Sequence, residues 1–125
     1  MKLMIVDDST IVRKVIEKFL KAHFPDVELV AEASNGVEGL RLFEEKQPDI
    51  VTMDITMPEM DGIVCMQKML KLNPRANIVV ISSLSDKDTM MEAEQKGAIG
   101  FLDKPITEDK MRELLDKVKD RMASG

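Results

Sequence analysis

Residues 50–62 read IVTMDITMPEMDG, a strand pattern that passes directly into a loop pattern. The apolar and partly β-branched run Ile50–Met53 is typical of a buried strand, and the Pro, Asp and Gly that follow predict its exit loop. Asp54 therefore lies at the carboxyl end of a strand. Open α/β sheets bind their ligands at this edge, so Asp54 is the first candidate functional residue.

Four further apolar runs share the character of this strand, and a helical pattern follows each: Leu3–Val6, Val27–Ala31, Ile78–Ile81 and Ile99–Leu102. None of them alternates between apolar and polar residues, which is typical of strands that are covered on both faces. The five runs together predict a parallel sheet.

The helical patterns have apolar residues three or four positions apart, as amphipathic helices require. These residues are Val12, Val15, Ile16, Phe19 and Leu20; Val37, Leu40 and Phe43; Ile63, Met66, Met69 and Leu70; Met90, Met91 and Ala93; and Met111, Leu114, Leu115, Val118 and Met122. Asp61 and Gly62 mark the start of the third helix, and Thr107 is the expected cap of the fifth.

The fourth helical pattern is the weakest, and we expect this helix to pack loosely. A capping signal, Ser85-x-x-Asp88, marks its start, and Gly97 marks its end. Met90 and Met91 are either adaptable core residues or part of a partner surface.

A strand and a helix that alternate five times predict an α/β fold. We expect a (βα)5 doubly wound sandwich of three layers, with a five-stranded parallel sheet between two layers of helices. No linker interrupts residues 1–125, so a single domain is expected.

The composition argues against several classes of protein. The 125 residues carry a net charge of −5, which disfavours direct binding to nucleic acid. No apolar run is long enough to cross a bilayer, so no membrane association is expected. Cys65 is the only cysteine and permits no internal disulfide, so we expect a cytoplasmic protein.

Polar side chains follow four of the five predicted strands. Asp7 and Asp8 follow the first strand, Asp54 the third, Ser82 the fourth and Lys104 the fifth. Parallel strands bring them to one edge, and in a doubly wound sheet of order 2-1-3-4-5 the first and third strands are neighbours where ligands bind. Three carboxylates there would repel one another unless a cation neutralises them. Because the donors are hard oxygens, they favour Mg²⁺, with Mn²⁺ as the alternative.

A divalent cation, a carboxylate, a lysine and a hydroxyl are the components of a phosphoryl-transfer site. The cation would bridge carboxylate and phosphoryl oxygens, while Lys104 and Ser82 would contact further phosphoryl oxygens. We expect Asp54 to be the nucleophile, because it lies on the central strand between the acid pair and Ser82.

The motifs of this edge occur in a set order: Asp7-Asp8, Asp54-x-x-Met57-Pro58-x-x-Asp61-Gly62, Ser82 and Lys104-Pro105. With this order and spacing, essentially the whole chain resembles the receiver domain of two-component response regulators, of the CheY-like single-domain type. The resemblance implies a flavodoxin/CheY-like fold with strand order 2-1-3-4-5 and a cis bond before Pro105.

The resemblance also implies roles for individual residues. Asp54 would accept a phosphoryl group from the phosphohistidine of a histidine kinase. Asp8, Asp54 and the backbone carbonyl of Thr56 would ligate Mg²⁺, and Asp7 would act through a water molecule.

The resemblance further implies that three residues report the phosphorylation. Ser82 and Lys104 would sense the aspartyl phosphate, and Phe101 would turn inward as a switch after Ser82 shifts. The alternative for Phe101 is an ordinary core residue of the fifth strand.

We therefore expect a stand-alone response regulator that acts by docking, most naturally in chemotaxis, since no output domain is visible. Its expected partners are a sensor histidine kinase or phosphotransfer domain, a downstream target such as the flagellar motor switch, and a phosphatase. It would assist its own phosphorylation and dephosphorylation without being a turnover enzyme. A monomer is expected, with a dimer as the alternative.

Several alternatives stay open. The chain could be the receiver part of a longer regulator, such as a methylesterase or a transcription factor, or a phosphorelay intermediate. A Mg²⁺-dependent phosphatase with an Asp nucleophile would need a second Asp at the position of Thr56. A flavodoxin-like electron carrier would need a hydroxyl-rich phosphate loop, where this chain has Asp7-Asp8.

Overall fold

The computed structural model describes residues 1–55, 61–82 and 87–124. Strands and helices alternate in these ranges: β1 (Lys2–Val6), α1 (Thr10–His23), β2 (Glu28–Ala33), α2 (Gly36–Lys46), β3 (Ile50–Asp54), α3 (Gly62–Leu72), β4 (Asn77–Ser82), α4 (Lys87–Gln95), β5 (Gly100–Asp103) and α5 (Glu108–Ser124). Each predicted strand is present, with ends no more than two residues from the predicted ones.

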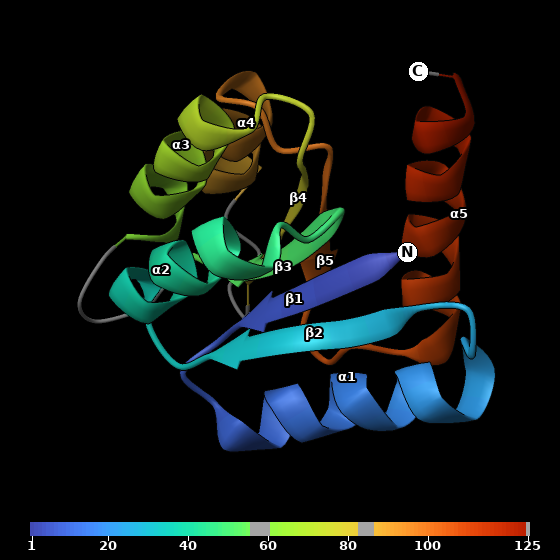
Figure 1. Ribbon diagram of the computed structural model, residues 1–125. Helices are drawn as coiled ribbons and strands as arrows, with labels where there is room; N and C mark the ends of the chain where they lie inside the picture. Colours follow the sequence, from blue (N-terminus) through green and yellow to red (C-terminus); the bar gives the residue numbers. More distant parts are fainter. Residues whose placement is uncertain (56–60, 83–86, 125) are drawn as a thin grey trace.

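The strands form one parallel sheet in the order β2-β1-β3-β4-β5, as Figure 1 shows. The predicted strand order is therefore confirmed. The chain changes its direction of winding between β1 and β3, which are paired from Leu3↔Ile50 to Val6↔Met53. A doubly wound sheet binds its ligands at the carboxyl ends of these two strands.

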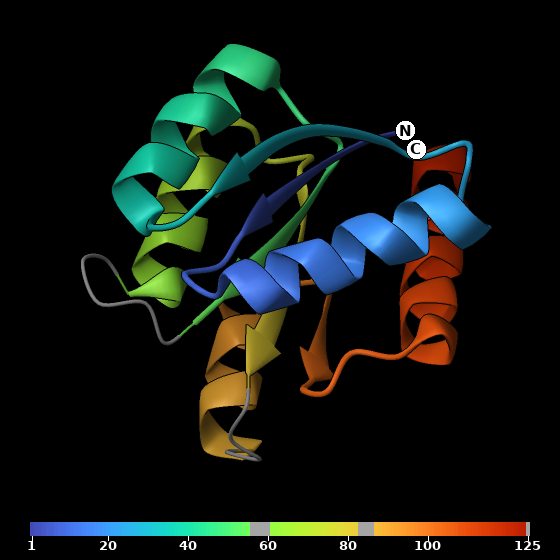
Figure 2. The same ribbon diagram turned by 90° about the horizontal axis from the view of Figure 1, so that it is seen from below.

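Helices cover both faces of the sheet and give the predicted three layers. One core lies between the sheet and the helices α1 and α5, and contains Leu3 and Ile5 of β1. The other core lies against α2, α3 and α4 and contains Met4 and Val6 of the same strand. Figure 2 shows α1 crossing the sheet on the side opposite to α2 and α3. Neighbouring β1 residues point to opposite faces, which explains why the strand has no polar face.

Side-chain caps fix the beginnings of several helices. Ser9 Oγ accepts a hydrogen bond from the Val12 amide at 3.3 Å, Asp61 Oδ1 accepts one from the Ile63 amide at 2.7 Å, and Thr107 Oγ1 accepts one from the Lys110 amide at 3.3 Å. The predicted cap Thr107 is thus confirmed, and Asp61, which was predicted to mark the start of the third helix, caps α3. Because Ser9 caps α1, Asp8 is not needed for this purpose.

The structure corrects some helix predictions. Val37 and Met122 are exposed, although the apolar patterns place them on buried faces. Met122 lies one turn beyond the last buried residue of α5, Val118, whereas Val37 follows the buried Gly36 but lies on a different side of α2.

The fourth helix ends at Gln95, and the predicted role of Gly97 in ending it is confirmed. Gly97 has a φ of 121°, and its amide donates to the carbonyl oxygen of Glu94. The predicted capping residue of this helix, Ser85, lies outside the described residues. Met90 is buried in the core, whereas Met91 is exposed.

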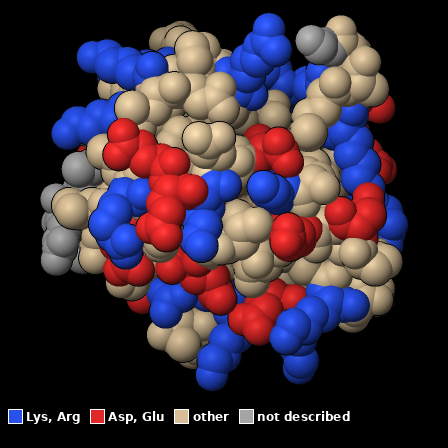
Figure 3. Space-filling model, in the orientation of Figure 1, with Lys and Arg blue, Asp and Glu red and all other residues tan. Residues whose placement is uncertain are grey.

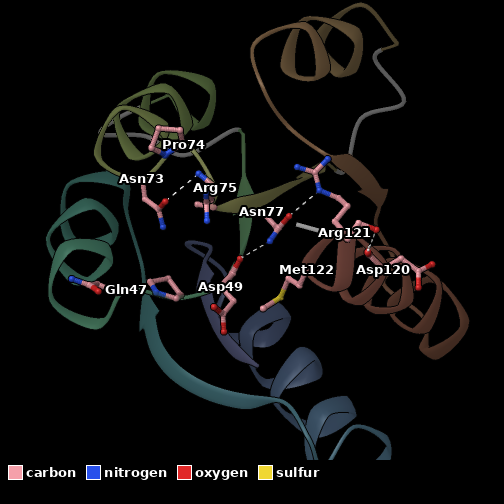
Figure 4. Close-up of a pocket in the computed structure, with 12 residues that line it drawn as sticks. Gln47, Asp49, Asn73, Pro74, Arg75, Asn77, Asp120, Arg121 and Met122 are labelled. Atoms are coloured by element: carbon pink, nitrogen blue, oxygen red, sulfur yellow. Dashed lines mark hydrogen bonds between the residues drawn. The ribbon is translucent and has the colours of Figure 1, made fainter.

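A cavity of about 870 Å³ lies at the amino edge of the sheet, opposite to the predicted site. The loops before β3 and β4 and the last turn of α5 line it, and Asn77 lies between Asp49 and Arg121 (Figure 4). Figure 3 shows acidic and basic side chains interspersed over one face of the molecule. No helix in residues 1–55, 61–82 or 87–124 has the length and apolar character needed to span a membrane.

Candidate functional site

The carboxylates of Asp7, Asp8 and Asp54 converge at the carboxyl edge of the sheet. Asp7 and Asp8 follow β1, and Asp54 is the last residue of the neighbouring strand β3. One oxygen of each carboxylate lies within 4.8 Å of the other two. Asp7 and Asp54 are buried, while Asp8 is exposed. The structure therefore brings together the three acids that the sequence predicts to meet, and one of them faces solvent.

Asp7 is held in place at its amide, its carbonyl and its side chain. Its amide donates to the carbonyl oxygen of Ala33 at 3.0 Å, and its Oδ1 accepts from the Ser9 amide at 2.8 Å. Its carbonyl oxygen accepts from Arg13 Nη1. Burial raises the pKa of the Asp7 carboxyl and the nearby Asp54 carboxylate adds to this, against the lowering effects of the Ser9 amide and of Lys104.

Lys104 provides a positive charge beside the acids. Its Nζ lies 3.5 Å from Asp7 Oδ2 and 3.7 Å from Asp54 Oδ2. Its backbone amide donates to the carbonyl oxygen of Ser82 at 3.0 Å, which ties the chain after β5 to the end of β4. The peptide bond between Lys104 and Pro105 is cis, as the family resemblance implies. The two strand ends thus place an ammonium group between two buried carboxylates.

Ser82 completes this edge of the sheet. It is the last residue of β4, and only 3% of its surface is exposed. Asp54 pairs with Ile81 in the parallel register, so Ser82 lies one residue further along the neighbouring strand. The serine is therefore close to the acids in the fold, and its role as a phosphate sensor stays a prediction.

Two further residues, Phe101 and Thr56, were predicted to take part in the site. Phe101 on β5 is 42% exposed, so the alternative that it is an ordinary core residue is wrong. Its role as a switch is not tested by this burial and stays a prediction. The predicted carbonyl ligand Thr56 lies outside the described residues.

The donor set fits a hard divalent cation. Three carboxylates offer oxygen ligands within a few ångströms of one another, as Mg²⁺ and Mn²⁺ prefer. Within the part of the chain that the structure describes, no hydrogen-bond donor reaches the buried Asp7 Oδ2, although Lys104 Nζ lies 3.5 Å away. A second positive partner would offset the free-energy cost of burying the charge of this oxygen. Asp7, Asp8 and Asp54 could therefore hold such an ion.

Gly62 and Arg13 also shape the site, and the sequence alone does not reveal how. A Cβ on Gly62 would lie 2.5 Å from the carbonyl oxygen of Asp54, so only glycine lets α3 begin this close to the end of β3. The Asp61-Gly62 pair does indicate a loop exit, but the close approach depends on the fold. No sequence pattern distinguishes Arg13 from the other basic residues of α1.

Comparison with known proteins agrees with this geometry. The family model of the response regulator receiver domain matches residues 3–116. The chemotaxis protein CheY of Listeria monocytogenes is 40% identical over 117 residues, which cover 94% of this chain and 97% of that protein.

Longer proteins and solved structures match as well. A protein-glutamate methylesterase/protein-glutamine glutaminase of Carboxydothermus hydrogenoformans is 39% identical over 126 residues, covering 94% of this chain but 35% of that protein. A chain of the CheX-CheY-BeF3-Mg complex of Borrelia burgdorferi superimposes with a TM-score of 0.89 at 29% identity, covering 95% of this chain and 89% of that one.

Proposed function

Because this chain belongs to the response regulator receiver family, we propose that Asp54 accepts a phosphoryl group and thereby switches the protein between two signalling states. The observation that carries the proposal is the arrangement around Asp54: two further carboxylates within 4.8 Å and the Lys104 ammonium group 3.7 Å away. This set of groups suits a carboxylate that must attack phosphorus next to negatively charged oxygens.

In the proposed reaction, a carboxylate oxygen of Asp54 attacks the phosphorus of a phosphohistidine on the partner kinase. The new O–P bond forms as the P–N bond breaks, and the imidazole leaves. Asp8 and Asp54, with the carbonyl of Thr56, would hold Mg²⁺, and Asp7 would contact it through water. When bound, the ion supplies positive charge that neutralises phosphoryl oxygens. Among residues 1–55, 61–82 and 87–124, Asp7, Asp8 and Asp54 form the one such acidic cluster.

In this proposal, Lys104 and Ser82 sense the phosphoryl group on Asp54. The Lys104 ammonium already lies between Asp7 and Asp54, and a phosphoryl group on Asp54 would offer it a stronger partner. Ser82, on the neighbouring strand, would donate its hydroxyl to another phosphoryl oxygen. These contacts exist only after phosphorylation, and such a difference is what shifts a two-state equilibrium.

The switched surface would be the one formed by α4, β5 and α5. Movement of Ser82 would open space beside β5, and the exposed ring of Phe101 could then pack inward. Lys104 joins the site to this surface, since it directly follows β5. A partner that distinguishes the two positions of Phe101 would read the phosphorylation state.

We place this receiver in a cytoplasmic chemotaxis pathway, as a single domain of residues 1–125. The support is a relative, the Listeria chemotaxis protein, that matches over nearly its full length. The partners would be a sensor histidine kinase and a downstream target. The similarity to a methylesterase of which the chain covers only 35% keeps the receiver of a longer regulator as the second candidate.

The test is direct phosphorylation by a small donor. Incubation with acetyl phosphate and Mg²⁺ should add one phosphoryl group, which hydroxylamine releases because it is an acyl phosphate. Asp54→Asn should abolish the label without loss of fold, whereas the remote control Asp120→Asn should be labelled like the wild type. Label that persists in Asp54→Asn would disprove the assignment.

The switch has its own test. Phosphorylation of the wild type should change the amide chemical shifts around Phe101 and Met111. Lys104→Ala should still take the label, more slowly, but should lose these shifts. A complete response in this variant would mean that Lys104 does not transmit the signal.

A further inference from the structure

Arg13 on α1 turns its guanidinium group back toward the end of β1. Its Nη1 donates to the carbonyl oxygen of Asp7, and its Nη2 donates to Thr10 Oγ1 at 3.3 Å. Its Nε lies 3.8 Å from Glu32 Oε1 on the edge strand β2. The side chain is only 18% exposed. Each of the three guanidinium nitrogens thus has a different partner.

The carbonyl that Arg13 contacts belongs to the peptide group between Asp7 and Asp8. A peptide group is planar, so a fixed carbonyl oxygen also fixes the direction in which the chain reaches Asp8. Hydrogen bonds with Ala33 and Ser9 already hold the amide and the side chain of Asp7. The exposed side chain of Asp8 depends on this backbone for its position.

Glu32 gives the guanidinium a second point of support. It lies opposite Ile5 in the β1–β2 register, and Ile5 is one residue before Val6, the last residue of β1. Arg13 therefore connects three segments: the beginning of α1, the edge strand β2 and the acid loop after β1. A charged donor makes the contact with the Asp7 carbonyl stronger than a neutral one would.

We propose that Arg13 is a positioning residue that holds the Asp7–Asp8 peptide group so that Asp8 is directed at the cation site. This inference rests on the proposed function, because it concerns the same site. Arg13 acts through the backbone and does not itself contact the ion or the phosphoryl group.

Arg13 should affect cation binding in two opposite ways. One effect comes from its positive charge, and the other comes from its contact with the Asp7 carbonyl oxygen. A positive charge close to the site repels a cation, so its loss alone would strengthen binding. Loss of the positioning contact would weaken binding, since partners that hold metal ligands in place typically contribute about tenfold or more to affinity. The sign of the change in affinity therefore separates the two effects.

The experiment measures Mn²⁺ affinity by electron paramagnetic resonance of free Mn²⁺, without any phosphodonor. Arg13→Met should bind Mn²⁺ about tenfold more weakly than the wild type. Arg13→Lys keeps the charge, which still repels the cation, but not the forked geometry, so it should bind at least as weakly as Arg13→Met. Arg75→Met removes an exposed arginine at the amino edge of the sheet and should leave the affinity unchanged. Circular dichroism establishes that each variant is folded.

The possible failures are distinguishable. A wild-type protein that does not bind Mn²⁺ would contradict the proposed cation site itself. A wild type that binds, with equal or tighter binding by Arg13→Met, would overturn the role of Arg13 alone. If Arg13→Met does not fold, Arg13→Lys decides, and unchanged affinity in that variant overturns the inference.

Discussion

The backbone at Asp54 leaves no room for a side chain on Gly62. A Cβ there would lie 2.5 Å from the Asp54 carbonyl oxygen and 2.6 Å from the Cα of Ile55. Both are backbone atoms, so a rotamer change cannot relieve the clash. The start of α3 therefore determines where the end of β3, and with it the carboxylate of Asp54, is placed.

We predict that Gly62→Ala both destabilises the protein and slows phosphorylation of Asp54. Overpacking of this kind typically costs about 1–3 kcal/mol of the free energy of unfolding, and a displaced Asp54 would no longer face Lys104. Urea denaturation and the rate of labelling by acetyl phosphate measure the two effects. In the control Gly100→Ala, the nearest atom to the new Cβ is Lys117 Nζ at 3.6 Å, an ordinary contact. A variant Gly62→Ala with wild-type stability and labelling rate would contradict this account.

For single residues, the sequence predicted the side chains of the site better than it predicted contacts with the backbone. Asp7, Asp8, Asp54 and Lys104 are charged residues at strand ends, and the parallel topology is enough to bring them together. The contact of Arg13 with a carbonyl oxygen depends instead on how α1 turns after β1. Such a contact leaves no pattern in the sequence.

At the scale of elements, the strands were the easiest part to predict. The apolar runs of β1, β3 and β4 are buried on both faces, so each of these runs is nearly as long as the strand itself, whereas β2 and β5 are partly exposed. The buried residues of the helices were harder, because an apolar residue such as Met122 can continue the helical period one turn beyond the last buried residue, Val118. Propensity and period carry no information on where the neighbouring layer stops.

The end of α5 is attached to the sheet by a buried asparagine. Asn77 is 5% exposed, and its Nδ2 donates to the carbonyl oxygen of Asp49 at 3.0 Å (Figure 4). Its Oδ1 accepts from Arg121 Nε at 3.0 Å. The side chain of Asn77 thus connects three segments that are far apart in the sequence. The periodicity of apolar residues gives no sign of these contacts.

We predict that Asn77→Ala lowers the free energy of unfolding by about 1–3 kcal/mol, because two hydrogen bonds of a buried side chain are lost. Arg121→Met should cost less on its own, and the double variant should show a coupling energy of at least about 0.5 kcal/mol. Chemical denaturation of the wild type, the two single variants and the double variant gives the four free energies of unfolding from which the coupling energy is calculated. The control Asn73→Ala removes a partly exposed asparagine at the end of α3, just before β4, and should cost less than Asn77→Ala. Fully additive effects would show that Asn77 does not connect α5 to the sheet.

At the scale of the whole molecule, the two edges of the sheet have different roles. Polar groups at the amino edge, such as Asn77 and Arg121, satisfy one another and hold elements together. At the carboxyl edge, three carboxylates are concentrated beside one ammonium group. Like charges at this distance oppose folding unless a cation joins them. Lys104 offsets only one of the three negative charges, so we expect the candidate site to lower the stability of the domain that carries it.

We therefore predict that Mg²⁺ stabilises the wild type and that loss of Asp8 has opposite effects with and without the ion. In EDTA, Asp8→Asn should be more stable than the wild type, because one of three clustered negative charges is gone. Mg²⁺ at ten times its dissociation constant should then stabilise the wild type by about 1.4 kcal/mol, because only the folded state holds the complete site. Asp8→Asn should gain much less, since it lacks a ligand.

The measurement is urea denaturation of both proteins in EDTA and in Mg²⁺, with NaCl added to equal ionic strength. Asp120→Asn removes an exposed charge at the other edge and should respond to Mg²⁺ like the wild type. If Asp8→Asn is the less stable protein in EDTA, the repulsion between the carboxylates is already balanced by Lys104. If Mg²⁺ stabilises all three proteins equally, the ion acts elsewhere, and the acid cluster is not its site.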